Sequence, residues 1–326
     1  MCQPLISFII PYYNIPEELF RNCLMSVLNL ELQVHEREII IVDDGSYIPL
    51  DSSWADENNN VFIIRQENKG LSAARNSGID KARGIYIQFI DSDDQIIAYL
   101  YNQCIAILRN EQPDILKFHY EFDDAKHNNT ISFDTWQSGT DFMIHNNLET
   151  GACAYLFKRD VLDNLRFTEG IYHEDEEFTP LLFLRAKKMI VTDAKAYYYL
   201  QRPHSITKSI DSESVNKRLD DFYQIILRLK TLNETLGELS PLKRRIDQAS
   251  MDYIINVIRL FAQENHCLKG VAKFRYVKRQ LENNISKMRS DSLFPLPKAS
   301  YTRNYSLFRF MTNRKPLRAF LCLCKF

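Results

Sequence analysis

The stretch Ile85-Tyr86-Ile87-Gln88-Phe89-Ile90-Asp91-Ser92-Asp93-Asp94 predicts the fold class of this 326-residue chain. Residues 85–90 form a short, mainly apolar run of the kind that becomes a buried strand. The run ends in three carboxylates within four residues, which we call the strand-end cluster (residues 91–94). Residues 5–14 and 38–46 repeat the pattern, since each begins as an apolar run and ends in polar side chains. Several buried strands with polar ends are therefore expected.

Helices are predicted between these strands. One is expected to begin near Pro16, with acids in its first turn, and another over residues 71–83, closed by Gly84. Strands separated by helices pair in parallel, with helices on both faces of the sheet. Because the carboxyl ends of parallel strands meet at one edge, the three polar strand ends are expected to converge there. The other expected strands are residues 61–64, 114–119, 152–157 and 189–199.

The pattern changes after about residue 213, where apolar residues recur only at helical spacing. One apolar stripe comprises Val215, Leu219, Phe222, Ile226 and Leu229, and a second comprises Val271, Phe274, Leu281, Ile285 and Met288. Spacing of this kind is typical of helix packing. We therefore expect an α/β domain over residues 1–210 and a helical region over residues 211–326.

The charge balance excludes one class of function. The chain has 41 basic and 42 acidic side chains, a formal net charge of −1, whereas dedicated nucleic-acid binders normally carry a basic excess. No nucleic-acid partner is therefore expected. The charge is unevenly distributed, because residues 292–326 hold seven Lys and Arg and no Asp or Glu. The preceding part of the chain accordingly carries a net charge of −8.

The basic tail, residues 292–326, also contains interleaved Phe and Tyr side chains. Cations mixed with aromatic rings bind anionic membrane surfaces, which predicts peripheral contact with the inner face of the cell membrane. A second interpretation stays open, in which the tail packs as a basic helix on the acidic body.

Seven scattered cysteines form no C-x-x-C pair of the kind that indicates a zinc or redox site. Most are expected to be buried thiols in a reducing compartment. No uncharged apolar run approaches the roughly 18 residues that cross a bilayer, and the first residues lack the parts of a secretory signal. The expected location is cytoplasmic.

Two acidic runs suggest chemistry. The strand-end cluster crowds carboxylates that repel one another unless a cation or a pKa change relieves them. Mg²⁺ or Mn²⁺ would do so, because these ions take oxygen ligands and keep positions for phosphate oxygens. We call the second run, Glu174-Asp175-Glu176-Glu177, the helix-start cluster, since a helix is expected to begin there. Plain alternatives are a solvated acidic turn for the first cluster and charge complementarity at a helix N-terminus for the second.

A third polar segment, Asn68-Lys69-Gly70, leads into a predicted helix that carries Arg75. Backbone N–H groups at a helix N-terminus and a guanidinium both bind phosphate. The segment is therefore a candidate phosphate site.

Together these motifs resemble the family 2 glycosyltransferases, which have the GT-A fold. The matching stretches are Ile9-Ile10-Pro11-Tyr12-Tyr13-Asn14, Val42-Asp43-Asp44-Gly45-Ser46, Asn68-Lys69-Gly70 with Ala73-Ala74-Arg75-Asn76, Phe89-Ile90-Asp91-Ser92-Asp93-Asp94, and Glu169-Gly170 followed by His173-Glu174-Asp175-Glu176. The resemblance covers about residues 4–210. It implies a GT-A nucleotide-diphospho-sugar transferase fold, a mostly parallel sheet flanked by helices, with a C-terminal helical extension.

The resemblance also implies an activity, which is inverting transfer of a sugar from a nucleotide sugar to an acceptor hydroxyl. A UDP-sugar is the favoured donor, and a saccharide or lipid-linked saccharide of polysaccharide synthesis is the expected acceptor. Residues 1–95 would form the nucleotide-binding half of the domain, and residues 96–210 the acceptor half.

Donor-binding residues follow from the same resemblance: Pro11, Tyr13, Asn14, Asp43, Asp44, Asn68, Gly70, Arg75, Asp91 and Arg202. Pro11, Tyr13 and one of the two aspartates at 43 and 44 would hold the nucleoside base. Arg202 or His204 would cover the diphosphate, although a polar surface turn is an equally plain interpretation of that segment.

The resemblance gives the metal and the proton acceptor as well. Asp91 would face the ribose and the metal, and Asp93 would ligate Mg²⁺ or Mn²⁺, with Asp94 as the open alternative. Asp175 is the implied general base, and Glu174 is the adjacent alternative.

The same motifs bear on three competing functions. A nucleotidyltransferase normally has a Gly-rich basic loop after its first strand, and a nicotinamide dehydrogenase has G-x-G-x-x-G there; residues 11–14 have neither. A catalytically silent, nucleotide-sugar-binding partner subunit of a polysaccharide-assembly complex stays open, because only turnover separates it from an enzyme.

Overall fold

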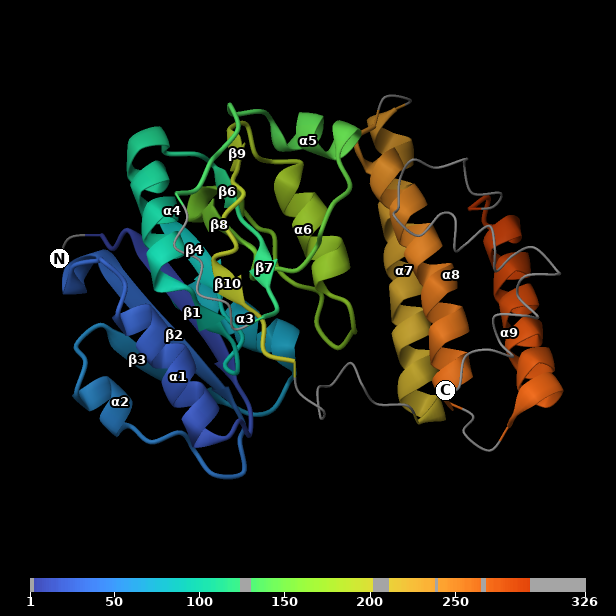
Figure 1. Ribbon diagram of the computed structural model, residues 1–326, viewed down its shortest axis with the longest axis horizontal. Helices are drawn as coiled ribbons and strands as arrows, with labels where there is room; N and C mark the ends of the chain where they lie inside the picture. Colours follow the sequence, from blue (N-terminus) through green and yellow to red (C-terminus); the bar gives the residue numbers. More distant parts are fainter. Residues whose placement is uncertain (1–2, 124–129, 202–210, 238–239, 265–267, 294–326) are drawn as a thin grey trace. The chain divides into compact units, whose positions relative to one another are not determined.

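The computed structural model describes residues 3–123, 130–201, 211–237, 240–264 and 268–293 (Figure 1). The chain divides into two compact units. The first comprises Met1–Phe142 and Thr150–Arg202, and the second comprises Met143–Glu149 and Pro203–Phe326. The boundary expected after residue 210 falls at the end of a segment outside the described residues, so that boundary stays a prediction.

A seven-stranded sheet forms the centre of the first unit, in the order β3-β2-β1-β4-β8-β6-β9. Its strands are β1 (Ile6–Tyr12), β2 (Arg37–Asp44), β3 (Val61–Gln66), β4 (Tyr86–Phe89), β6 (Ile115–Lys117), β8 (Tyr155–Lys158) and β9 (Met189–Val191). The first four strands along the chain pair in parallel, with β1 between β2 and β4. The parallel core that the alternating pattern predicts is therefore confirmed.

Helices cover both faces of this sheet because β1 is apolar on both sides. Ile9 faces α3 (Leu71–Lys81), where a Cβ on Gly78 would overlap its Cγ2. Phe8 faces the opposite side and packs against Tyr101 of α4 (Ala98–Glu111), with ring centroids 6.1 Å apart. Tyr12, on the side of Phe8, meets Phe20 of α1 (Glu17–Leu28). The first unit is thus layered helix, sheet, helix (Figure 1).

A second, three-stranded sheet lies in the first unit, in the order β5-β10-β7. Its strands are β5 (Gln95–Ile96), β7 (Tyr120–Glu121) and β10 (Tyr197–Tyr198). Since β5 directly follows the strand-end cluster, this small sheet connects the cluster to residues about 100 positions later in the chain. The remaining short elements are η1 (Val34–Glu36), α2 (Ser53–Asp56), α5 (Gly139–His145), η2 (Arg159–Val161) and α6 (Asp175–Phe183).

The sheet is mostly parallel, as expected, and β8 runs antiparallel to both β4 and β6. One sequence-based expectation about strands is corrected. The strand expected over 189–199 is two strands in different sheets, β9 and β10.

Gly84 does not end the preceding helix as expected. α3 ends at Lys81, and Ala82 already has extended backbone. Gly84 is instead packed against β1, where a Cβ would lie 2.5 Å from the Ser7 backbone nitrogen. Its N–H donates a hydrogen bond to Ser7 Oγ at 2.8 Å. The glycine is therefore required by close strand contact and not by a helix terminus.

The second unit contains the helices α7 (Ser212–Leu236), α8 (Leu242–Glu264) and α9 (Gly270–Ser290). The stripe expected on α7 is buried throughout, as predicted. The stripe expected on α9 is only partly correct, because Leu281 and Met288 are buried whereas Val271 is exposed. Among the described residues, no helix is both long and apolar enough to cross a membrane.

Gly78 generates the first testable prediction. In Gly78→Ala the new methyl group overlaps Ile9 Cγ2, so the substitution should lower the unfolding free energy by about 1–3 kcal/mol. An exposed helical glycine would instead gain stability on the same change. Chemical denaturation measures the difference. Because Ile9→Ala removes the overlapping atom, the double variant should lose less stability than the two single losses combined; additive losses would show that the contact is unimportant.

Candidate active site

The polar ends of β1 and β2 meet at one edge of the sheet. Tyr12 lies opposite Asp43 in the parallel register. Beyond it, the Asn14 N–H donates to Ser46 Oγ at 3.0 Å, and Asn14 Oδ1 accepts from the Tyr47 N–H at 2.9 Å. The predicted convergence of these loops is confirmed. Tyr13 is exposed at this edge, and its ring centroid lies 6.3 Å from that of Tyr47.

Asp43 and Asp44 are buried and hold neighbouring loops in place. Asp43 accepts from the Ser46 N–H at 2.9 Å and from Arg65 Nη1 at 2.6 Å. Asp44 accepts from the backbone N–H groups of Lys69 and Gly70, at 3.0 and 2.8 Å. The segment 68–70 is therefore fixed by a carboxylate of β2. Contact of either aspartate with a nucleoside base stays a prediction.

Close backbone approach explains the glycine that follows Asp44. Gly45 has a φ of +75°, and a Cβ there would lie 2.6 Å from the Asn68 backbone nitrogen. Only glycine adopts this conformation without strain and leaves room for the second loop. The loops after β2 and β3 are thereby packed together beside Pro11, which is buried at the end of β1.

Arg75 of α3 joins the two acidic clusters. Its Nη2 lies 2.9 Å from Asp91 Oδ1, and its Nη1 lies 2.5 Å from Glu174 Oε1. The Arg75 side chain is only 4% exposed, and its guanidinium carbon lies 5.3 Å from the centre of the Phe167 ring. Burial lowers the pKa of Arg75, but Asp91 and Glu174 outweigh it and raise that pKa overall. The guanidinium therefore stays charged between two carboxylates.

This placement bears on the role expected for Arg75. A side chain enclosed in this way, with two carboxylate partners, lies behind the acidic clusters and not at the surface. Arg75 positions the two clusters, and the direct phosphate contact that the sequence predicts for it stays a prediction.

The helix-start cluster begins α6, as predicted, with Glu174 at the N-cap position and Asp175 as the first helical residue. One oxygen of Glu174 is bound to Arg75. Burial raises the pKa of Glu174, Arg75 lowers it, and Asp175 raises it, with a net increase. Asp175 is half-buried and next to this pair.

The strand-end cluster separates into accessible and buried carboxylates. Asp91 and Asp93 are partly exposed, whereas Asp94 is buried. Asp94 Oδ2 accepts from Tyr197 Oη at 2.8 Å, and its Oδ1 accepts from the Leu200 N–H at 2.8 Å. Burial, and then the charge of Asp91, raise the pKa of Asp94 to about 8. Asp94 therefore holds the small sheet, and the choice between Asp93 and Asp94 as metal ligand stays a prediction.

The cluster fits a divalent cation of the Mg²⁺ or Mn²⁺ type. Asp91 and Asp93 supply carboxylate oxygens, the ligands these ions prefer, and the mutual repulsion that raises the Asp94 pKa is relieved by a cation. Among the described residues, no three His, Cys, Asp or Glu side chains form a complete metal site. A cation at Asp91 and Asp93 would thus take its other ligands from elsewhere, as Mg²⁺ commonly does with substrate phosphates.

The sequence-based predictions missed two residues that are important to the site. Tyr197 Oη accepts from the Asp91 N–H at 3.0 Å while it donates to Asp94, so it fixes the strand-end cluster. Asn76 makes two hydrogen bonds to the backbone of Phe167, each of 2.9 Å, and thereby holds the segment that leads to α6. Asn76 stands in a matched motif, which was a usable signal. Nothing local marks Tyr197, since its partners are about 100 residues away.

Most predicted site residues lie at this one edge of the first unit. Asn14, Asp43, Asp44, Asn68 and Gly70 are joined by the contacts of the β1, β2 and β3 loops. A further set, Arg75, Asp91 and Glu174, is joined by ion pairs. Arg202 and His204 lie outside the described residues, as does the tail from residue 294.

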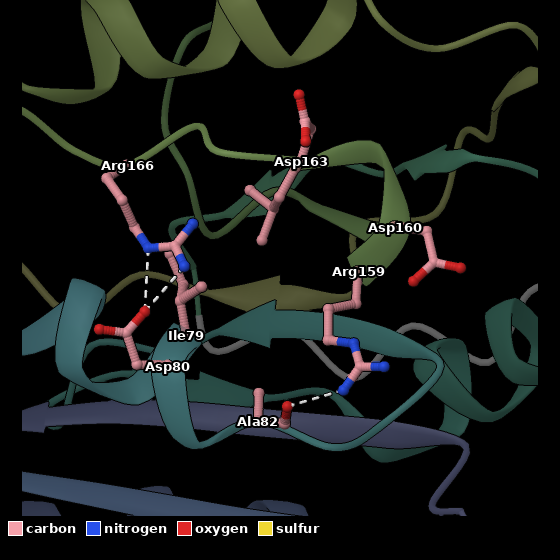
Figure 2. A pocket seen from close by; sticks show the side chains of 8 residues that line it. Ile79, Asp80, Ala82, Arg159, Asp160, Asp163 and Arg166 are labelled. Carbon is pink, nitrogen blue, oxygen red and sulfur yellow. Dashed lines mark hydrogen bonds and ion pairs between the residues drawn. The ribbon is translucent and has the colours of Figure 1, made fainter.

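A cavity of about 510 Å³ lies at the other end of α3, lined by residues that include Ile79 and Asp160 (Figure 2). Its arginines already have partners, since Arg166 pairs with Asp80 at 2.7 Å and Arg159 donates to the Ala82 carbonyl at 3.0 Å. The cavity contains neither acidic cluster. It is therefore not part of the candidate active site.

The bridging position of Arg75 generates a prediction about stability. Arg75→Ala leaves Asp91 and Glu174 side by side without their cation, and should lower the unfolding free energy by about 3–5 kcal/mol. Urea denaturation measures this loss. The control is Arg166→Ala, whose ion pair with Asp80 is solvent-exposed and should contribute no more than about 1 kcal/mol. Equal losses in the two variants would contradict the bridging role.

Comparison with known proteins agrees with this arrangement. The family model described as Glycosyl transferase family 2 matches residues 7–165. The chain is 30% identical over 238 residues to the uncharacterized glycosyltransferase EpsJ of Bacillus subtilis strain 168, and the match covers 68% of each chain. The matched family region contains the β1, β2 and β4 ends and Arg75.

Solved structures give the same fold. S. aureus TarS 1–349 in complex with UDP-GlcNAc superimposes with a TM-score of 0.55 at 18% identity, over 88% of this chain and 92% of that one. The mannosyltransferase PcManGT from Pyrobaculum calidifontis, in complex with GDP-Man and Mn²⁺, also gives a TM-score of 0.55, at 13% identity over 99% of this chain and 88% of that one. The expected GT-A fold is confirmed, and the chain belongs to glycosyltransferase family 2.

Proposed function

We propose that this glycosyltransferase moves a sugar from a nucleotide sugar to an acceptor hydroxyl, with inversion at the anomeric carbon. A UDP-sugar is the proposed donor, which the UDP-GlcNAc complex of the similarly folded TarS supports. The proposed acceptor is a saccharide or lipid-linked saccharide of polysaccharide synthesis. The proposed location is cytoplasmic, with residues 292–326 as a candidate membrane contact.

The contact of Arg75 with both Asp91 and Glu174 carries this proposal. It brings a carboxylate at the end of β4 and the carboxylates at the start of α6 to opposite sides of one cation. A transferase of this kind needs a leaving-group site and a proton acceptor a short distance apart. The two clusters supply the residue types for those two tasks.

The proposed reaction assigns the proton to Asp175. The acceptor oxygen bonds to the anomeric carbon, the bond from that carbon to the diphosphate oxygen breaks, and the electron pair leaves with the diphosphate. Asp175 accepts the hydroxyl proton, which contributes roughly 10²–10⁴-fold to the rate. Glu174 is the weaker candidate because its Oε1 is bound to Arg75 at 2.5 Å. Attack opposite the leaving group inverts the configuration.

Asp91 and Asp93 would hold Mg²⁺ or Mn²⁺ in this proposal, and the Mn²⁺ in the PcManGT complex supports that choice. A bound divalent ion would stabilise the negative charge that develops on the diphosphate. Arg75 keeps Asp91 in position from behind. Asp94 and Tyr197 hold the backbone of the same turn.

Asp175→Asn tests the assignment of the base. The amide cannot accept the acceptor proton, so kcat should fall by at least about 10²-fold while the affinity for the donor is kept. Radiolabelled transfer and donor calorimetry measure the two quantities. Asp160→Asn, beside the cavity of Figure 2, is the matched control and should transfer normally. Near-normal turnover of Asp175→Asn would remove Asp175 from the role and leave Glu174.

A panel of nucleotide sugars, measured by calorimetry with Mn²⁺ and with chelator, tests donor and metal together. We expect one UDP-sugar to bind, and chelation or Asp93→Asn to weaken that binding by at least about tenfold, since one ion ligand is lost. Asp163→Asn is the control at the far end of α3. UDP-sugar binding that is unaffected by the chelator would contradict the proposed role of a divalent ion. Binding without transfer to any acceptor would favour a silent partner subunit.

A further inference from the structure

Tyr120 lies directly beside the strand-end cluster, although no motif contains it. It is the first residue of β7 and pairs with Tyr197 of β10. The two rings meet edge to face, with centroids 5.3 Å apart. Because the Tyr197 hydroxyl bonds both the Asp91 N–H and Asp94, the Tyr120 ring is held one residue away from the candidate metal ligands.

The Tyr120 hydroxyl differs from three buried tyrosine hydroxyls of this unit. Those of Tyr101, Tyr155 and Tyr197 each bond another side chain. None of the hydrogen bonds among the described residues uses the Tyr120 hydroxyl. In the part of the chain that the structure describes, the Tyr120 hydroxyl is not one of the fully enclosed polar atoms without a partner, so it keeps access to solvent and can bond a ligand.

Gly151 makes room for this hydroxyl. A Cβ at position 151 would overlap Tyr120 Oη, and it would lie 3.0 Å from Cζ. Gly151 itself is fixed by its neighbours, since the Thr150 carbonyl accepts from Thr179 Oγ1 at 2.5 Å. The hydroxyl therefore occupies a space that the backbone leaves open for it.

The surroundings of the Tyr120 hydroxyl are buried and acidic. Burial, above all, and then Cys153, Asp91 and Asp175 raise the pKa of Tyr120. The phenol therefore stays protonated, so it is a neutral hydrogen-bond donor next to the residue that holds the strand-end cluster.

We propose that the Tyr120 hydroxyl binds the sugar ring of the donor by a hydrogen bond to one of its hydroxyl groups. The inference rests on the proposed function, in which the anomeric carbon lies between the diphosphate near Asp91 and the acceptor near Asp175. The sugar ring must then occupy the space that Tyr120 faces. The nucleotide part of the donor lies elsewhere, at the loops after β1 and β2.

The test compares Tyr120→Phe with the unaltered full-length chain in calorimetry, with Mn²⁺ present throughout. Phenylalanine keeps the ring and its packing on Tyr197 and removes only the hydroxyl. Affinity for the UDP-sugar should fall about 5- to 10-fold, as expected for one lost neutral hydrogen bond. Affinity for UDP, which has no sugar ring, should stay within about twofold.

Two further variants sharpen the result. Tyr155→Phe removes a hydroxyl that bonds Thr179 at 2.8 Å, and should leave both affinities unchanged. Gly151→Ala displaces the Tyr120 hydroxyl, so it should reproduce the loss of sugar affinity, with no further loss in the Tyr120→Phe background. Equal affinities of Tyr120→Phe and the unaltered chain for the UDP-sugar, or equal losses for UDP and UDP-sugar, would overturn the inference. Failure of the unaltered chain to bind any nucleotide or nucleotide sugar would overturn the proposed function and this inference with it.

Discussion

The arrangement of the site depends on one buried guanidinium. Arg75 is 4% exposed and lies between Asp91 and Glu174, which would otherwise repel each other across the same space. A charged group out of contact with water is tolerated only when it is paired and hydrogen-bonded. The two carboxylates are in turn stabilised by the positive charge of the guanidinium. The turn after β4 and the start of α6 are therefore held at one distance by a single side chain from a third element, α3.

The remaining carboxylates divide into those that build the site and those left accessible. Asp43, Asp44 and Asp94 are buried, and their oxygens accept hydrogen bonds from backbone N–H groups. Asp91, Asp93 and Asp175 keep partial exposure. An acidic sequence motif thus contains both buried structural carboxylates and accessible carboxylates, and the sequence alone does not distinguish them. The structure distinguishes them by burial, because the buried carboxylates hold neighbouring loops by hydrogen bonds whereas the others keep oxygens open to solvent.

Much of the fold could be read from the chain, because its information is local. Apolar runs that end in polar clusters predicted β1, β2 and β4, and their parallel pairing then placed the clusters at one edge. The helix-start cluster was located for the same reason, because its run of acidic residues is also a local signal. The antiparallel β8, the division of 189–199 and the role of Gly84 were not predictable, because each depends on a strand far away in sequence.

The site was predicted less completely than the fold. Motifs identified the residues but not the two partners of Arg75, 16 and 99 positions away, which enclose its side chain. Tyr197 and Tyr120 carry no local signal. Their importance arises only where β7 and β10 pair beside the turn after β4.

The separation between Arg75 and Glu174 also affects the order in which the molecule assembles. Arg75 and Glu174 lie 99 positions apart in the chain, and Asp94 and Tyr197 lie 103 positions apart. Contacts of such long range form late, because the chain entropy lost in closing the loop comes before any gain. β1, β2 and β3 pair through contacts much closer in sequence, such as Ile6 with Arg37 and Ile39 with Val61. A newly made chain would therefore acquire this part of its sheet first, and the two acidic clusters would meet later.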